Sequence, residues 1–229
     1  MNQQSNTGFT IVELMLAMTF ISLLLMGIAL TTIQISNIYN KGITLREVNQ
    51  VGRSISEDVN KTISQTNPFN IDGGPNTDYI SSDAGGRLCA GNYTYVWNLA
   101  ETLRSTSPGT VTGYNKYISP NTEQIRLVKV NDPGGSLCRN PESDIDSSKS
   151  VELLNSSDRN LAIHKFAVVK STEDTLTNQA LYAMNIIIGT NDDSQLDTLN
   201  NVCKPPSDGA GNEDYCSVNE FNIVVRAGN

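Results

Sequence analysis

The sequence predicts an α+β fold in which one long N-terminal helix precedes a globular domain built on an antiparallel β-sheet. Three observations support this: an uncharged apolar run near the N-terminus, helix-spaced apolar residues after it, and strand-like runs rich in Tyr, Ile and Val in the remainder. Helix and strands are segregated along the chain, and that segregation is typical of the α+β class.

The apolar run extends from Leu14 to Ile33 without a charged residue or a proline. About 20 residues at about 1.5 Å each match a bilayer core roughly 30 Å thick. The run is rich in Leu, Ile, Met and Ala, which favour helix, and a single segment in lipid must satisfy its own backbone hydrogen bonds. We therefore expect a single membrane-spanning helix with the bulk of the chain outside the cytoplasm.

The helix is expected to continue as an amphipathic half through Ser64, so that it occupies residues 9–64. Pro68 follows, and it biases Asn67 away from the helical region. The apolar positions that recur at helical spacing are Ile38, Leu45, Val48, Val51, Ile55, Val59 and Ile63.

The remaining residues, 65–229, are enough for one globular domain. Residues 65–87 are rich in Gly, Asn, Asp, Ser and Pro, and they predict a loop. The strands are expected at residues 90–99, 113–119, 123–130, 161–169, 179–189 and 220–226.

The four cysteines all follow the apolar run, and none forms a Cys-x-x-Cys pair. They are expected to form disulfides, and of the three possible connectivities we favour Cys89–Cys138 with Cys203–Cys216. The second bond would close a Pro/Gly/Asp-rich loop with few apolar residues, and closing about 14 residues contributes roughly 3 kcal/mol. Four free thiols in a reducing compartment are the alternative.

Charge and motifs weigh against nucleic-acid binding and catalysis. The net charge is −8 with a pI of about 4.6, and nucleic-acid binders instead cluster Lys and Arg. The single histidine, His164, lies in a strand-like run, and the sequence contains no nucleophile motif, phosphate loop or His-Glu-x-x-His motif. We expect a protein that is not an enzyme.

No cofactor is expected, and calcium is the one alternative considered. Acidic loops could supply oxygen ligands, although neither loop has EF-hand spacing and such loops are ordinarily just solvated. The candidate ligands are Asp208, Asn212, Glu213 and Asp214 in one loop and Asp192, Asp193 and Asp197 in the other.

Glu13 is the one charge within the apolar N-terminal region. One interpretation places it at the headgroup boundary, where a carboxylate costs little. The other places it one turn inside the membrane, because residues 9–12 extend the apolar run, and there an unpaired charge costs about 2.5–3.5 kcal/mol or more. A partner cation would arise if the chain were cut between Gly8 and Phe9.

The segment from Gly8 to Leu14, GFTIVEL, resembles the cleavage and assembly motif of type IV prepilins and of the pseudopilins of type II secretion. The resemblance implies that a prepilin peptidase cuts after Gly8 and methylates the new N-terminal Phe9. It also implies that Glu13 pairs with the terminal amine of a neighbouring subunit as the helices stack. The implied partners are that peptidase, other pilin subunits through the N-terminal helix, and the inner-membrane assembly platform.

Residues 48–59 are loosely similar to W-type minor pilins and J-type pseudopilins. The large domain with long loops favours a minor pilin or pseudopilin. The resemblance implies a leader at 1–8, a helix at 9–64 and an extracytoplasmic domain at 65–229. It also implies a subunit of the cytoplasmic membrane that later enters an extracellular or periplasmic filament. The alternative is a single-pass anchored extracellular adhesin or binding domain that never polymerises.

Overall fold

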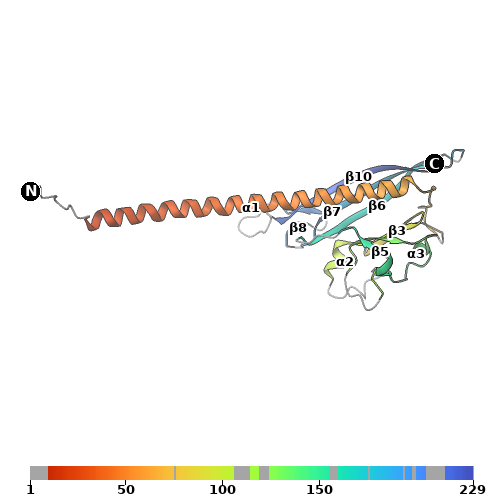
Figure 1. Cartoon of the computed structure of the whole chain (residues 1–229), viewed down its shortest axis with the longest axis horizontal. Coiled ribbons are helices and arrows are strands. Elements are labelled where there is room, and N and C mark those ends of the chain that lie inside the picture. The colour runs from red at the N-terminus through yellow and green to blue at the C-terminus, as the bar shows by residue number, and fades with distance from the viewer. Residues whose placement is uncertain are drawn as a thin grey trace, which may run out of the picture.

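The computed structural model describes residues 10–74, 76–105, 114–118, 124–154, 159–174, 176–192, 194–197, 200–204 and 215–228. Figure 1 shows one helix that runs out of a β-rich domain, and the expected α+β class is confirmed. The helices are α1 (Ile11–Ser64), α2 (Ala100–Arg104), α3 (Ser136–Arg139) and the 3-10 turn η2 (Ser147–Lys149). The strands are β1 (Tyr79–Ser81), β2 (Gly85–Ala90), β3 (Tyr93–Asn98), β4 (Leu127–Asn131), β5 (Ser150–Glu152), β6 (Leu161–Asp174), β7 (Gln179–Thr190), β8 (Leu196–Asp197), β9 (Val202–Cys203) and β10 (Val218–Ala227).

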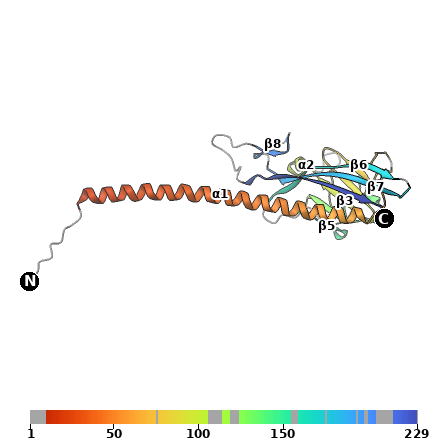
Figure 2. The ribbon, with the colours of Figure 1, turned by 90° about the horizontal axis from the view of Figure 1, so that it is seen from above.

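Helix α1 has 54 residues, roughly 80 Å at about 1.5 Å per residue. It ends at Ser64, as the sequence predicts, while the predicted start at Phe9 lies outside the described residues. Figures 1 and 2 show its first half projecting beyond the domain and its second half lying along it. The helix therefore joins an uncovered rod to a covered one.

The face of α1 that packs on the domain differs in part from the predicted stripe. Within the predicted stripe Val48, Ile55 and Val59 are buried, whereas Ile38 is 73% and Leu45 is 47% exposed. The buried positions are Thr44, Val48, Gly52, Ile55, Val59, Thr62 and Ile63. Full burial begins at Thr44, and before it Asn40 is half-buried where it contacts Tyr215.

The first sheet is an antiparallel meander of five strands in the order β1-β2-β3-β4-β5. One face carries Tyr95, Trp97 and Leu127 into the main core, which includes the buried side of α1. The opposite face carries Val96 and Val128 into a smaller core with residues 117, 125, 130 and 145. This sheet is therefore covered on both faces.

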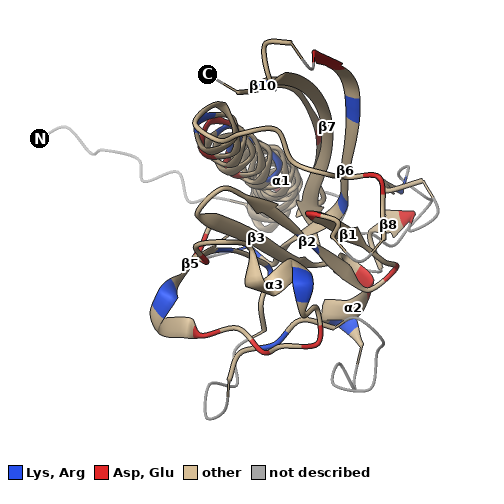
Figure 3. Cartoon of the chain, turned by 90° about the vertical axis from the view of Figure 1, so that its right-hand side faces the viewer, with Lys and Arg blue, Asp and Glu red and all other residues tan. Residues whose placement is uncertain are grey.

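The second sheet has three antiparallel strands in the order β10-β7-β6. Its inner face packs against α1 through residues such as Met184, Ile186 and Val225, and Figure 3, which looks along the helix, shows α1 lying between the two sheets. On its outer face Val169 and Val224 are 61% and 69% exposed, respectively. This sheet is covered by α1 on one side and carries exposed apolar residues on the other.

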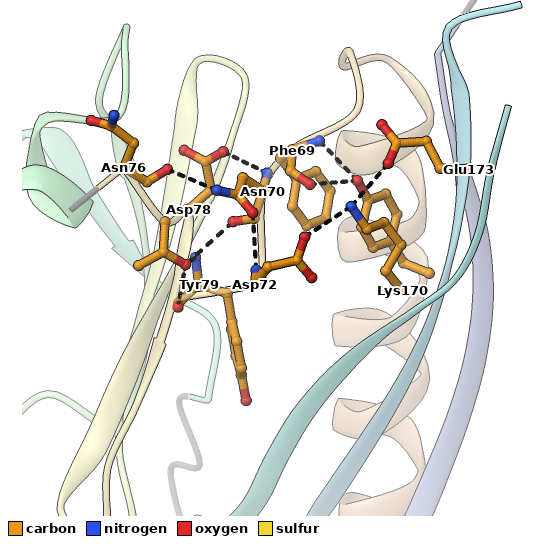
Figure 4. A network of polar contacts seen from close by, with 10 residues as sticks. Phe69, Asn70, Asp72, Asn76, Asp78, Tyr79, Lys170 and Glu173 are labelled. Carbon is orange, nitrogen blue, oxygen red and sulfur yellow. Dashed lines mark hydrogen bonds and ion pairs between the residues drawn. The ribbon is translucent and has the colours of Figure 1, made fainter. Parts of the chain in front are cut away.

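The connection from α1 to β1 crosses from one sheet to the other, as Figure 4 shows. The ring of Phe69 stacks on Tyr182 with centroids 3.9 Å apart. The Tyr182 hydroxyl donates to the Phe69 carbonyl at 2.6 Å and accepts from its N–H at 2.8 Å. Lys170 bonds both Asp72 (3.3 Å) and Glu173 (3.0 Å). These contacts fix the end of the helix to the second sheet.

Two strand predictions and one loop prediction need correction. Residues 113–119 were expected to form a strand, but within their described part only single bridges occur, at Lys116 and Tyr117. The expected strand at 90–99 instead begins after a turn, as β3, and the expected loop at 65–87 contains β1 and the start of β2. Strand β2 is not predicted from the sequence because it begins with two glycines, which have poor strand propensity. Gly86 is required there, since a Cβ on it would lie 2.4 Å from Cζ2 of the buried Trp97 ring.

Candidate assembly site on the N-terminal helix

The N-terminus of α1 is closed by a reciprocal pair of side chains, Thr10 and Glu13. The Thr10 N–H and hydroxyl each donate to Glu13 Oε2 at 2.9 Å, while the Glu13 N–H donates to Thr10 Oγ1 at 3.3 Å. Thr10 has the extended backbone of an N-cap (φ −77°, ψ 151°). Sequence reasoning missed this role of Thr10, although the pattern Thr-x-x-Glu before an apolar run is the signal for a capping box.

Glu13 remains available to an external partner. Its side chain is exposed, both bonds from Thr10 go to Oε2, and no described residue donates to Oε1. Within the described residues no lysine or arginine pairs with Glu13, and Gly8 and Phe9 lie outside them. Glu13 is therefore a carboxylate with one oxygen used locally and one free.

The helix that follows is long and apolar enough to cross a membrane, and none of its most apolar window is buried. Its few hydroxyl groups bond within the helix. Thr19 donates to Leu16 O at 2.9 Å, Ser22 donates to Met18 O at 2.8 Å, and Thr31 donates to Ile28 O at 2.8 Å. This internal pairing is what an apolar surrounding requires of polar groups.

Strand β10 and Tyr215, three residues before it, attach the second half of α1 to the domain. Asn40 donates to the Tyr215 hydroxyl at 3.2 Å, close to where the projecting half begins. Further along, Gly52 makes room for the ring of Phe221: a Cβ on Gly52 would lie 2.0 Å from Phe221 Cζ. The glycine fixes where the strand sits along the helix.

A polar cluster attaches the same half of α1 to the first sheet. Lys129 Nζ donates to Asp58 Oδ1 at 2.9 Å and to Thr62 Oγ1 at 2.8 Å, while Tyr95 donates to Asp58 Oδ2 at 2.7 Å. Burial raises the pKa of the Tyr95 hydroxyl well above its usual range, so Tyr95 stays a donor. The Asp58 carboxylate of α1 therefore accepts hydrogen bonds from both β3 and β4.

Two disulfides are present, Cys89–Cys138 and Cys203–Cys216, and the favoured pairing is confirmed. The first joins β2 to α3. Beside it, Arg87 donates to the carbonyls of Leu137 (3.0 Å), Asn140 (3.2 Å) and Ser143 (2.8 Å), and burial lowers the pKa of Arg87 to about 10. The second disulfide joins β9 to the residue after Tyr215, at the end of the domain near the projecting half of α1.

His164 is in a structural position. Its Nε2 lies 3.0 Å from the Thr190 carbonyl, to which it donates, and burial lowers the pKa of the imidazole, which favours the neutral ring. Sequence reasoning and structure agree that His164 lies on a strand, β6.

The acidic side chains considered for calcium do not converge where they are described. Asp192 accepts from Ser194 and Gln195, and Asp197 accepts from Asn200. No trio of His, Cys, Asp or Glu suited to a metal ion occurs among the described residues. Asp193, Asp208, Asn212, Glu213 and Asp214 lie outside the described residues.

Comparison with protein-family models, with curated proteins and with solved structures gives no match to this chain. The residues of the chain itself are therefore the basis on which its function is inferred.

Proposed function

We propose that this chain is a structural and assembly subunit, a minor pilin or pseudopilin, of a type IV pilus or a type II secretion-like filament. The observation that carries the proposal is a carboxylate, Glu13, in the first turn of an uncovered apolar helix, with one oxygen free. The segment around Gly8 and Phe9 resembles the prepilin motif, and this resemblance implies the partner of Glu13: the terminal amine of Phe9 on a neighbouring subunit.

Cleavage after Gly8 creates an ammonium group on Phe9, beside the cap residue Thr10. In apolar surroundings this ammonium and the Glu13 carboxylate of a neighbour attract strongly, because little water screens them. A wrong axial offset leaves both charges unpaired, which is costly in lipid. The pair therefore favours one axial stagger between neighbouring helices.

The rest of the molecule supports a subunit that moves as one piece. Asn40, Gly52 and Asp58 attach the covered half of α1 to β10 and to the first sheet, so a pull on the helix reaches the domain directly. A large domain beside the helix hinders close repetition, which favours a minor subunit at a tip or initiation site over the main shaft.

The expected partners are a prepilin peptidase, other pilin subunits through α1, and an inner-membrane assembly platform, without nucleic acid. The subunit would lie in the cytoplasmic membrane before assembly and in an extracellular or periplasmic filament afterwards. It would act without catalysis and without a cofactor. The second candidate function is an anchored extracellular binding domain that does not polymerise, and the exposed Val169 and Val224 of the second sheet favour it.

Mass spectrometry of the mature N-terminus separates the two functions. We expect the mature chain to begin at a methylated Phe9 in cells with an active prepilin peptidase. A chain that still begins at Met1 in those cells would refute the filament proposal and leave the anchored binding domain.

The charge of Glu13 can be tested apart from its capping role. Glutamine also fits the third position of a capping box, so Glu13→Gln keeps the cap and removes the charge. We expect Glu13→Gln and Glu13→Ala to enter sheared filaments at least about tenfold less than wild type, equivalent to about 1.4 kcal/mol. Incorporation is normalised to the amount of each variant in the membrane.

Thr10→Val is the matched control, because it removes the capping hydroxyl and leaves the carboxylate. We expect its incorporation to stay near that of wild type. Normal incorporation of both Glu13 variants would show that Glu13 is only an interfacial residue.

A further inference from the structure

A polar cavity of about 260 Å³ lies at the end of the domain nearest the projecting half of α1, where β7 leads toward β8 and the chain returns through Tyr215. Figure 2 places β8 at this end of the domain. The cavity is lined mainly by amide, charged and hydroxyl side chains, among them Arg159, Asn160, Asn191, Asp192, Gln195 and Tyr215. It contains none of the residues assigned to assembly.

Gln195 is the side chain that indicates a ligand at this cavity. It is 6% exposed, and its Nε2 donates to Asp192 Oδ2 at 2.8 Å. A carboxylate can accept only from the amide nitrogen, so this bond fixes which way the amide is turned. Gln195 Oε1 is then a buried acceptor that receives no hydrogen bond from any described residue.

Arg159 supplies the complementary group. Its guanidinium lies over the ring of Tyr215, 5.2 Å from the centroid, and its Nε is a buried donor that finds no acceptor in the described part of the chain. Buried polar atoms in folded proteins are nearly always paired, so one unpaired acceptor and one unpaired donor at a single cavity call for an explanation.

The neighbouring polar groups are already held in place by the protein. Asp192 Oδ1 accepts from the Ser194 hydroxyl at 2.7 Å, Asn191 Oδ1 accepts from Arg104 at 2.5 Å, and Asn160 donates to the Asn191 carbonyl at 3.1 Å. A wall fixed in this way loses little conformational freedom when a ligand enters.

The open groups restrict the chemistry of the ligand. A fully deprotonated anion such as sulfate could accept from Arg159 but could not donate to Gln195, and a metal ion could bind Gln195 Oε1 but could not accept from Arg159. A hydroxyl group both donates and accepts, and the charges of Arg159 and Asp192 balance, so a neutral ligand with neighbouring hydroxyls fits both. Drug-sized ligands occupy pockets of about 300–1,000 Å³, so this smaller cavity has room for about one ring.

We propose that this cavity binds one neutral sugar residue of a glycan. Its hydroxyls donate to Gln195 Oε1 and accept from Arg159. The inference does not depend on the filament proposal, because a polymerising subunit and a non-polymerising anchored domain could each bind a glycan here.

The test uses the full chain in a zwitterionic detergent without a sugar headgroup, with methyl glycosides of glucose, galactose and N-acetylglucosamine as probes. Saturation-transfer NMR is expected to detect binding of at least one of them. Gln195→Met keeps the side-chain length and removes the acceptor, and Arg159→Lys removes the donor Nε. We expect each variant to weaken glycoside binding about tenfold.

Asn185→Leu is the matched control, because Asn185 also has a buried unpaired amide oxygen but lies on β7 outside the cavity. We expect it to bind like wild type. Arg159→Lys keeps the test decisive if Gln195→Met fails to fold. The inference is overturned if no glycoside binds at millimolar concentration, if the folded variants bind as wild type does, or if sulfate binds here and displaces the glycoside.

Discussion

The two halves of helix α1 have the same kind of apolar side chain in opposite surroundings. Ile28, in the first half, is 53% exposed, whereas Ile55, in the second half, is 1% exposed. Both halves are helical without interruption, so the domain is not what makes the first half a helix. The difference shows that the domain covers only the second half of α1 and leaves the apolar side chains of the first half exposed.

The largest test of this comparison replaces the same residue in each half. We expect Ile55→Ala to lower the free energy of unfolding by about 2–5 kcal/mol, because it leaves a cavity in the main core. Ile28→Ala should leave it unchanged. Urea unfolding of the full chain in detergent can be followed by the fluorescence of Trp97, the single tryptophan. An equal loss of unfolding free energy in both variants would contradict the division of α1 into a covered and an uncovered half.

The glycines of α1 provide a second pair. A Cβ at Gly52 collides with Phe221, so Gly52→Ala is expected to destabilise the domain by about 1–3 kcal/mol. A Cβ at Gly42 meets nothing within 4 Å, so Gly42→Ala should stabilise the helix by up to about 1 kcal/mol through its propensity alone. Calorimetric melting of the two variants should shift in opposite directions, and a shared direction would refute the packing argument.

The Asp58–Lys129 pair tests the link between the covered half and the first sheet. Lys129 is 17% exposed, and Lys129→Met should cost about 1–3 kcal/mol, because Asp58 then keeps only the bond from Tyr95 as a side-chain partner across this interface. Lys116 pairs with Asp144 at 3.9 Å and is 57% exposed, so Lys116→Met is expected to change stability by less than about 0.5 kcal/mol. Denaturant midpoints measure both, and equal shifts would show that burial of the first pair is unimportant.

The smallest effect is expected where the covered half begins. Tyr215→Phe removes the acceptor for Asn40 and should cost about 0.5–1.5 kcal/mol. Tyr39 is 68% exposed on the neighbouring uncovered stretch, so Tyr39→Phe should have no effect. Guanidinium titrations of both variants decide this, and an equal response would move the boundary of the covered half toward the N-terminus.

The sequence predicted those parts of the candidate site that depend on neighbours along the chain. Glu13 was found because a charge in an apolar run is conspicuous, and the helix was found because its apolar residues recur at helical spacing. Thr10 could have been found in the same way from Thr-x-x-Glu. The cavity at Gln195 was not foreseen, because its walls come from separate segments that are all polar in sequence.

By itself the sequence determined the class of fold and the end of α1 at Ser64, because each follows from local pattern and composition. It favoured the pairing of the four cysteines, with a loop-length argument for Cys203–Cys216, and the structure then decided that pairing. Only the tertiary structure decided where burial on α1 begins, why Gly86 lies in a strand, and that Asp58 meets Lys129, 71 residues away. The periodicity of apolar residues predicts that α1 has an apolar face. How much of that face is covered depends on the length of the β-strands that pack against it. That length is a property of the folded domain, so no window along the helix contains it.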